Sequence, residues 1–346
     1  MSEIDESWLL PEPAAETPLK KFAPEEMLTC DACLRANAPT RAQCMYCGAP
    51  LSQSTTTQTV EPAAAVEEAE GNKHYVVVAA PDGQSIDDSA VAQLATRFHW
   101  KPEELHVALG TSGPVPLTSV SSESDAMRIS SELKNVGIES AAVSTVQLKI
   151  EVNHTIIRAL EFGDGSVTAI TKVGKQRLPA ELNDIQLVVT GRLLVHRVEI
   201  DERRSRSSVK ALDRREISED QTVVDLHLRS LDAPWRILVN DFDFSCLGEH
   251  KGLTVFDNIN ALVEMLKERT PAEVNDSYTR VRTFLNNVWP LQNTASQSRS
   301  RRPRAGRHDF STVTASDNES QFNNYSRLVW CWQRRAQKPL DESGSV

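Results

Sequence analysis

Four cysteines in a short segment constrain this chain of 346 residues more than any other feature. They form two Cys-x2-Cys pairs, Cys30 with Cys33 and Cys44 with Cys47, which are separated by ten residues. Each pair brings two thiolates to one face of a tight turn, and four thiolates are typical ligands of a tetrahedral structural zinc site. We therefore predict that these cysteines bind one structural Zn²⁺, a closed site with no open position for catalysis.

The segment LTCDACLRANAPTRAQCMYCGAPL, within residues 27–51, resembles the short bacterial zinc ribbons. Those modules share the paired knuckles, a turn of the Asn-x-Pro type and an ending like CGAPL. The spacing also fits the Ran-binding-protein type of finger, whose members bind single-stranded RNA or ubiquitin. Leu28 stands where that type has a Trp, and Arg41 is the single arginine between Asn37 and Cys44, so the residues that would read a base are missing. The resemblance thus implies a structural or protein-docking role ahead of RNA binding.

Charge and hydropathy exclude several classes of protein. The net charge of −10 argues against a surface that binds polyanions throughout, although one local basic patch remains compatible with it. No run approaches 18 consecutive apolar residues, so we expect no transmembrane helix. The N-terminus, MSEIDESWLLPEP, is acidic and lacks the basic region and long apolar run of a secretory signal. We therefore expect a cytoplasmic protein, in which cysteines favour metal binding over disulfides.

Composition predicts a multidomain chain, because aromatic residues make up only 5% and several stretches are too polar to pack. The predicted segments are a disordered acidic arm at 1–26, the zinc ribbon at 27–51, a linker at 52–72, an α+β unit at 73–146, a β-rich domain with two C-terminal helices at 147–290, a basic linker at 291–310, and an amphipathic element with a polar tail at 311–346.

The α+β unit is predicted from a β-branched run followed by helical periodicity. HYVVVAA at 74–80 is typical of a buried strand. Two helices follow, and Gly110 to Pro116 is expected to break the chain. Ser121 or Ser122 then caps a third helix, which Gly137 ends before a returning strand. The predicted order is strand, helix, helix, helix, strand.

Residues 74–146 also resemble, in order and spacing, the C-terminal domain of the bacterial ribosomal stalk protein. The opening strand, the break GPVPLTSV and the segment SESDAMRISSELKNVGIESAAV carry this resemblance. The Gly- and Lys-rich segment with which that family contacts translation factors is replaced here by RFHWKPEEL. The resemblance therefore implies the fold, without the factor binding.

The β-rich domain is predicted from about six short strands, and residues 150–290 resemble no named family. Gly163-Asp164-Gly165 is typical of a hairpin turn. Gly191, inside the apolar run 185–200, indicates a bulge or a turn between two strands, and the charged stretch 201–216 is expected to be a mobile loop. This spacing favours a barrel or sandwich, and a pleckstrin-homology-like barrel is compatible with it.

Helical periodicity resumes after the predicted strands. Thr254 is expected to cap one helix that Pro271 ends, and the stretch 272–289 is expected to form a second. Helices that follow antiparallel strands usually cover the sheet. The element 320–335, SQFNNYSRLVWCWQRR, is expected either to dock on the β-rich domain of the same chain or to bind a partner or membrane surface.

The basic linker offers one place for a polyanion. Its arginines are Arg299, Arg301, Arg302, Arg304 and Arg307. They could contact nucleic acid by releasing counterions, but no aromatic residues that would stack on bases lie among them. Nucleic acid is therefore a less favoured partner than protein.

The chain contains no HExxH, GxxxxGK[ST] or GxSxG motif. We therefore predict a non-enzymatic, zinc-ribbon interaction or adaptor protein that binds a protein partner. The alternative is a nucleic-acid- or ribosome-associated protein that uses the zinc ribbon and the arginine-rich linker. Neither the identity of the partner nor the oligomeric state follows from the sequence.

Overall fold

The structure, a computed structural model, describes residues 28–30, 36–45, 51, 74–79, 87–98, 100–111, 113–149, 151–204, 209–299 and 308–337. The chain divides into two compact units, Met1–Gln58 and Thr59–Val346. In the first unit, strands β1 (Leu28–Thr29) and β2 (Ala36–Asn37) form an antiparallel pair. Cys30, Cys44 and Leu51 are buried beside this pair. The predicted acidic arm at 1–26 and linker at 52–72 lie outside the described residues.

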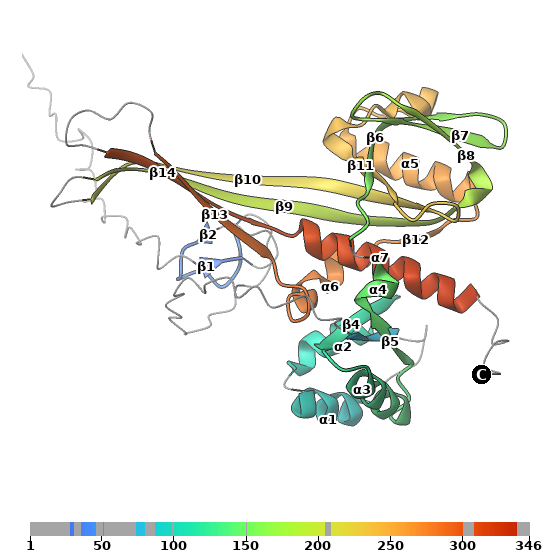
Figure 1. Ribbon diagram of the computed structural model, residues 1–346, viewed down its shortest axis with the longest axis horizontal. Helices are drawn as coiled ribbons and strands as arrows, with labels where there is room; N and C mark the ends of the chain where they lie inside the picture. Colours follow the sequence, from blue (N-terminus) through green and yellow to red (C-terminus); the bar gives the residue numbers. More distant parts are fainter. Residues whose placement is uncertain are drawn as a thin grey trace, which may run out of the picture. The chain divides into compact units, whose positions relative to one another are not determined.

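The second unit begins with a small α+β layer, visible beside the main sheet in Figure 1. Its antiparallel sheet has the order β4-β3-β5, with β3 at His74–Ala79, β4 at Pro114–Val120 and β5 at Ser140–Ser144. Its helices are α1 (Asp88–Phe98), α2 (Pro102–Leu109), α3 (Glu123–Asn135) and α4 (Thr145–Leu148).

Strand β4 replaces part of the break that we expected from Gly110 to Pro116. β4 is an edge strand of its sheet, so Pro114 and Pro116 need not donate to a second neighbour. The prediction for α3 is confirmed at both ends. The Ser122 hydroxyl accepts a hydrogen bond from the backbone N–H of Asp125, and Gly137 has a φ of +84° just after the helix.

A nine-stranded mixed sheet dominates the second unit. Its order is β13-β14-β9-β10-β11-β6-β7-β8, and β12 also pairs with β9. The strands are β6 (Thr155–Phe162), β7 (Ser166–Thr171), β8 (Arg177–Glu181), β9 (Ile185–Arg204), β10 (Val209–Leu228), β11 (Trp235–Leu238), β12 (Glu273–Asn275), β13 (Gln292–Arg299) and β14 (His308–Asp317).

The predicted barrel is wrong, because this sheet is open: β13 and β8 end it and do not pair with each other. The prediction of a mobile loop at 201–216 is also wrong for most of these residues. Residues 201–204 continue β9 and 209–216 belong to β10, so two 20-residue strands replace several short ones. The predicted hairpin at Gly163-Asp164-Gly165 is confirmed between β6 and β7. The structure therefore confirms a mixed α+β fold, in which a large open sheet takes the place of the barrel.

Helices cover both faces of the inner part of the sheet. Val188, Val224 and Leu226 contribute to one core, together with α5 (Val255–Arg269). Leu187 and Val189 point to the opposite core, which contains α6 (Tyr278–Leu285), α7 (Glu319–Gln337) and the small α+β layer. This alternation with period two is what a strand buried on both faces produces.

Gly191 is neither a bulge nor a turn, since it pairs with Val223 in unbroken register. A Cβ atom there would lie 2.5 Å from the ring of Phe322 in α7 and 2.9 Å from the ring of Tyr278 in α6. Glycine therefore permits both helices to approach the sheet. The first part of the helix expected at 272–289 is strand β12, whereas the C-terminal element 320–335 lies within α7 and packs into the core of its own chain.

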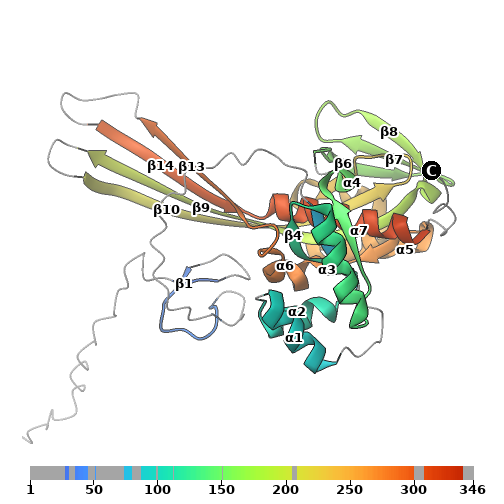
Figure 2. The same cartoon turned by 60° about the horizontal axis from the view of Figure 1, so that its bottom comes forward.

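The outer parts of four strands form an extension that we call the arm: residues 193–204 of β9, 209–221 of β10, and all of β13 and β14. Figure 2 shows these strands continuing beyond the helices of the second unit. Among the arm side chains that the structure describes, Leu194 alone is buried. Both faces of the arm are therefore open to solvent. Part of the basic linker expected at 291–310 is thus strand β13 and the start of β14.

Candidate functional site

Two of the four predicted zinc ligands lie within the described residues. Cys30 and Cys44, one from each knuckle, are both buried, and the side-chain amide of Asn37 donates to the sulfur of Cys44 at 3.4 Å. The same side chain accepts a hydrogen bond of 2.9 Å from the backbone N–H of Met45. Buried sulfurs with an N–H donor suit thiolate ligands. Cys33 and Cys47 lie outside the described residues, within which no group of three or more metal-binding side chains occurs.

Of the five arginines of the predicted polyanion contact, one lies within the described residues, at the end of the arm. Arg299 is the last residue of β13, whereas Arg301, Arg302, Arg304 and Arg307 lie outside the described residues. Residue Arg204 pairs with Val209 of β10 and with His308 of β14. The connections β9–β10 and β13–β14 therefore leave from the same end of the arm.

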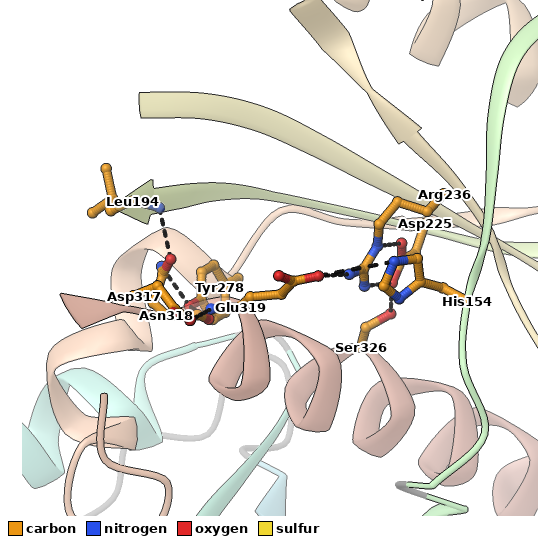
Figure 3. Close-up of polar contacts among 9 residues, drawn as sticks. All are labelled: His154, Leu194, Asp225, Arg236, Tyr278, Asp317, Asn318, Glu319 and Ser326. Carbon is orange, nitrogen blue, oxygen red and sulfur yellow. Dashed lines mark hydrogen bonds and ion pairs between the residues drawn. The ribbon is translucent and has the colours of Figure 1, made fainter. Parts of the chain in front are cut away.

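A buried ion pair that the sequence analysis missed links the sheet to α7 (Figure 3). Asp225 of β10 accepts hydrogen bonds from Nε and Nη2 of Arg236 in β11, at 2.7 and 2.8 Å, and both side chains are 1% exposed. Burial alone would raise the pKa of Asp225, but the guanidinium of Arg236 lowers it below its usual range. The carboxylate is therefore ionised inside the protein. The sequence VVDLHL at 223–228 carries a signal for this buried pair, because Asp225 and His227 alternate with apolar residues on a strand.

Ser326 of α7 joins Asp225 to His227. Its hydroxyl donates to Asp225 at 2.7 Å and lies 2.8 Å from Nε2 of His227. Because the single hydroxyl proton goes to the carboxylate, the imidazole must donate from Nε2. Burial lowers the pKa of His227 to about 3, so the ring is neutral. In a hydrolytic triad the histidine stands between serine and aspartate, whereas here serine stands between the other two, and all three side chains are buried. This arrangement does not activate a nucleophile.

His154 and Glu319 extend the network toward the surface (Figure 3). Oε1 of Glu319 lies 3.6 Å from Nη1 of Arg236 and 3.9 Å from Nε2 of His154. Burial and the charges of Arg236 and Arg327 lower the pKa of His154 to about 4, and they outweigh the opposite effect of Asp225. The adjoining cavity measures about 30 Å³, roughly a tenth of the volume that ligand sites have. We interpret the network as a connection between sheet and helix.

The half-buried cysteines show no activated thiol. Burial raises the pKa of Cys246 to about 11, and burial likewise raises the pKa of Cys331. A nucleophilic cysteine needs a lowered pKa. Asp241 and Asp243, which alternate on one segment, are each engaged elsewhere: Asp241 pairs with Lys172 at 2.7 Å, and Asp243 caps the turn at Ser245.

The root of the arm is closed by one asparagine, shown in Figure 3. Asn318 directly follows β14, and its side-chain amide accepts from the backbone N–H of Leu194 at 2.7 Å and donates to the carbonyl of Arg192 at 2.9 Å. It also donates to the hydroxyl of Tyr278 at 2.9 Å. The side chain thus continues the β9–β14 ladder for one step and ties it to α6.

The outer edge of the arm is strand β13. From Gln292 to Ser298 it carries no charge and no proline, and the side chains at 292–296 are exposed. Within the part of the chain that the structure describes, β13 pairs with β14 alone, so its other edge has backbone donors and acceptors without a neighbouring strand.

Two other edges of the main sheet are protected, at β8 and at the outer part of β10. β8 carries Arg177, Pro179 and Glu181, and the outer part of β10 reads DRREISED at 213–220. Charges and proline on an edge strand discourage pairing with another chain. Residues 292–298 of β13 lack both, which makes this stretch the best candidate site for an added strand. This strand could not be predicted from the sequence, because QNTASQSR has the composition of a linker.

Comparison with known proteins gives this chain no family: no protein-family model, no curated protein and no solved structure matches it. None of the helices in the described residues is long and apolar enough to cross a membrane.

Proposed function

We propose that this chain is a non-enzymatic interaction protein, in which the arm binds a protein partner by adding an extended segment of that partner to the edge of β13. The observation that carries the proposal is the open edge of β13, which is uncharged and free of proline from Gln292 to Ser298, whereas the edges at β8 and the outer part of β10 are protected. An added strand gains affinity from main-chain hydrogen bonds, which β13 offers over eight residues.

The zinc ribbon at 27–51 is a second module of the same proposal. Cys30, Cys33, Cys44 and Cys47 would hold a structural Zn²⁺, which supplies folding free energy to a segment too short for a core of its own. The burial of Cys30 and Cys44 and the N–H donor from Asn37 support this assignment.

Site-specific photocrosslinking in cells tests the role of β13. A photoreactive amino acid replaces Gln292, and the control carries it at Arg177 on the edge of β8. We expect cross-links from Gln292 to one recurrent segment of a partner protein, and none to that segment from Arg177. A Thr294→Lys/Ser296→Lys variant should lose these cross-links, because lysines on an edge disfavour strand addition.

The matched control variant is Ser166→Lys/Gln176→Lys, which adds the same charge at exposed positions of β7 and its turn. It should keep the cross-links. Equal labelling from Gln292 and Arg177, or cross-links that survive the lysines on β13, would remove the proposal.

A nucleic-acid-binding arm is the second candidate function, and the register of the arm favours it. Arg203, Arg204 and Lys210 stand at the same end of the arm as Arg299, although about 90 residues separate the two stretches. Clustered basic residues bind phosphates with a steep dependence on salt. Titration of labelled RNA and DNA tests it. Binding at 50 mM salt that weakens at least about tenfold by 200 mM would support it, and no binding at 50 mM salt would exclude it.

A further inference from the structure

A pocket of about 360 Å³ opens between α4, the segment after β10 and one face of α7. Side chains of α7 form one wall at helical spacing: Arg327, Trp330, Cys331, Arg334 and Arg335. The other wall consists of Gln147, Leu148, Lys149 and Asp232. The pocket is separate from the β13 edge. It adjoins the buried network around Asp225, since the ring of Trp330 stacks on His227 at 5.4 Å and Arg327 also lines the small cavity beside Asp225.

The walls carry four cationic side chains and one carboxylate. The ammonium of Lys149 donates to Asp232, so this carboxylate is already engaged. Among the described residues, no carboxylate lies within 4.0 Å of the guanidinium of Arg327, Arg334 or Arg335. The pocket therefore has an excess of positive charge that its own walls do not neutralise.

Arg327 is a buried cationic residue that lines the pocket, and its hydrogen bonds hold it in place. Its side chain is 6% exposed, and its guanidinium donates to the backbone carbonyls of Asp232 and Val152. Arg335 donates to the carbonyl of Ala142 at 3.1 Å, and Arg334 lies over the ring of Trp330 at 5.6 Å. Contacts with neutral groups hold these arginines in place. Asp225 and Asp232 offset part of the charge of Arg327, and the remaining positive charge of the three arginines is available to an anion.

We propose that this pocket binds the phosphate group of a small phosphate monoester. A guanidinium presents paired N–H donors that match phosphate oxygens, and several such groups around one pocket suit a dianion. The volume lies at the lower end of the range for small-molecule sites. Leu148 and Trp330 offer apolar surface to the organic part of the ligand.

Calorimetric titration of the full chain at constant ionic strength tests the proposal. The probes are inorganic phosphate, glycerol 3-phosphate and glycerol, with chloride as the background anion. We expect both phosphates to bind and glycerol not to bind. An Arg334→Gln/Arg335→Gln variant should bind glycerol 3-phosphate at least about tenfold more weakly, since it loses two charge-assisted contacts. Both arginines are exposed, so this variant should keep its fold.

The matched control is Arg97→Gln/Arg128→Gln, which removes two exposed arginines from α1 and α3 and should bind like the unchanged protein. A second readout is alkylation of the half-buried Cys331, which glycerol 3-phosphate should slow while leaving Cys246 unaffected. The proposal is overturned if the protein does not bind phosphate in preference to chloride. It is also overturned if the two double variants bind glycerol 3-phosphate equally well.

Discussion

Asp225 and Arg236 form a two-point ion pair, with N–O distances of 2.7 and 2.8 Å, at a place where each side chain is 1% exposed. The pair lies on the face of the sheet that α7 covers. From that helix, Ser326 donates a hydrogen bond to Asp225, and the ring of Phe322 lies 5.1 Å from the guanidinium carbon of Arg236. A charge left alone at this depth would be costly, so the two residues depend on each other.

Asp225→Asn should therefore destabilise the protein strongly. Removing one partner of a buried pair leaves the other charge uncompensated, which costs about 3–5 kcal/mol in the free energy of unfolding. Urea denaturation measures it. The control is Lys267→Gln, which breaks an exposed pair with Glu264 and should cost less than about 1 kcal/mol. Similar costs for the two variants would contradict the role given to Asp225.

Stability should fall as the pH drops below about 6.5. The folded protein keeps His227 and His154 neutral, with pKa values of about 3 and 4, whereas the unfolded chain protonates both near 6.5. Between these values the unfolded state binds more protons, so each histidine removes stability as pH falls, by about 1.4 kcal/mol per pH unit.

Denaturation at pH 7 and pH 5 checks this dependence. His154→Gln should reduce the loss of stability between the two values by about half, because it removes one of the two histidines whose pKa is lowered by burial. A variant that loses as much stability as the unchanged protein would show that the pKa of His154 is the same in the folded and unfolded states.

Gly191→Ala should destabilise the contact between β9 and α7. The added Cβ would lie 2.5 Å from the ring of Phe322, and overpacking of this kind costs about 1–3 kcal/mol. Thermal unfolding measures it. In a Phe322→Leu background the same substitution should cost less, since the smaller side chain leaves room. An equal cost in both backgrounds would mean that Phe322 is not the obstacle.

Asn318→Ala should loosen the root of the arm. The backbone N–H of Leu194 and the carbonyl of Arg192 would each lose a hydrogen bond, at a cost of about 1–3 kcal/mol. Hydrogen exchange followed by mass spectrometry should show faster exchange in β14 and the outer part of β9. Asn293→Ala, on the exposed β13, should leave exchange at the root unchanged.

Zinc removal should affect the first unit and leave the second unit stable. We expect one zinc per chain by elemental analysis, and none in a Cys30→Ser/Cys33→Ser variant. Because Thr59–Val346 is a separate compact unit, its thermal unfolding should not shift in this variant. A large shift would show that the ribbon contributes to the stability of the second unit.

Features that depend on local contacts could be predicted from the sequence. The cap of α3 at Ser122, the turn at Gly137 and the β6–β7 hairpin at Gly163-Asp164-Gly165 each follow from residues a few positions apart. The zinc site also rests on short separations along the chain, between four cysteines, and it stays a prediction.

Only the tertiary structure decided the features that depend on distant partners. Residues 201–204 became strand because β10 and β14 pair with them on either side, and 292–299 because β14 lies beside them. Position 191 requires glycine because the rings of Phe322 and Tyr278, about 130 and 90 residues away in the sequence, leave no room for a Cβ atom. Asp225 is tolerated in the interior because Arg236 and Ser326 meet it there. Local sequence sets propensities, whereas pairing and burial supply the free energy that selects among them.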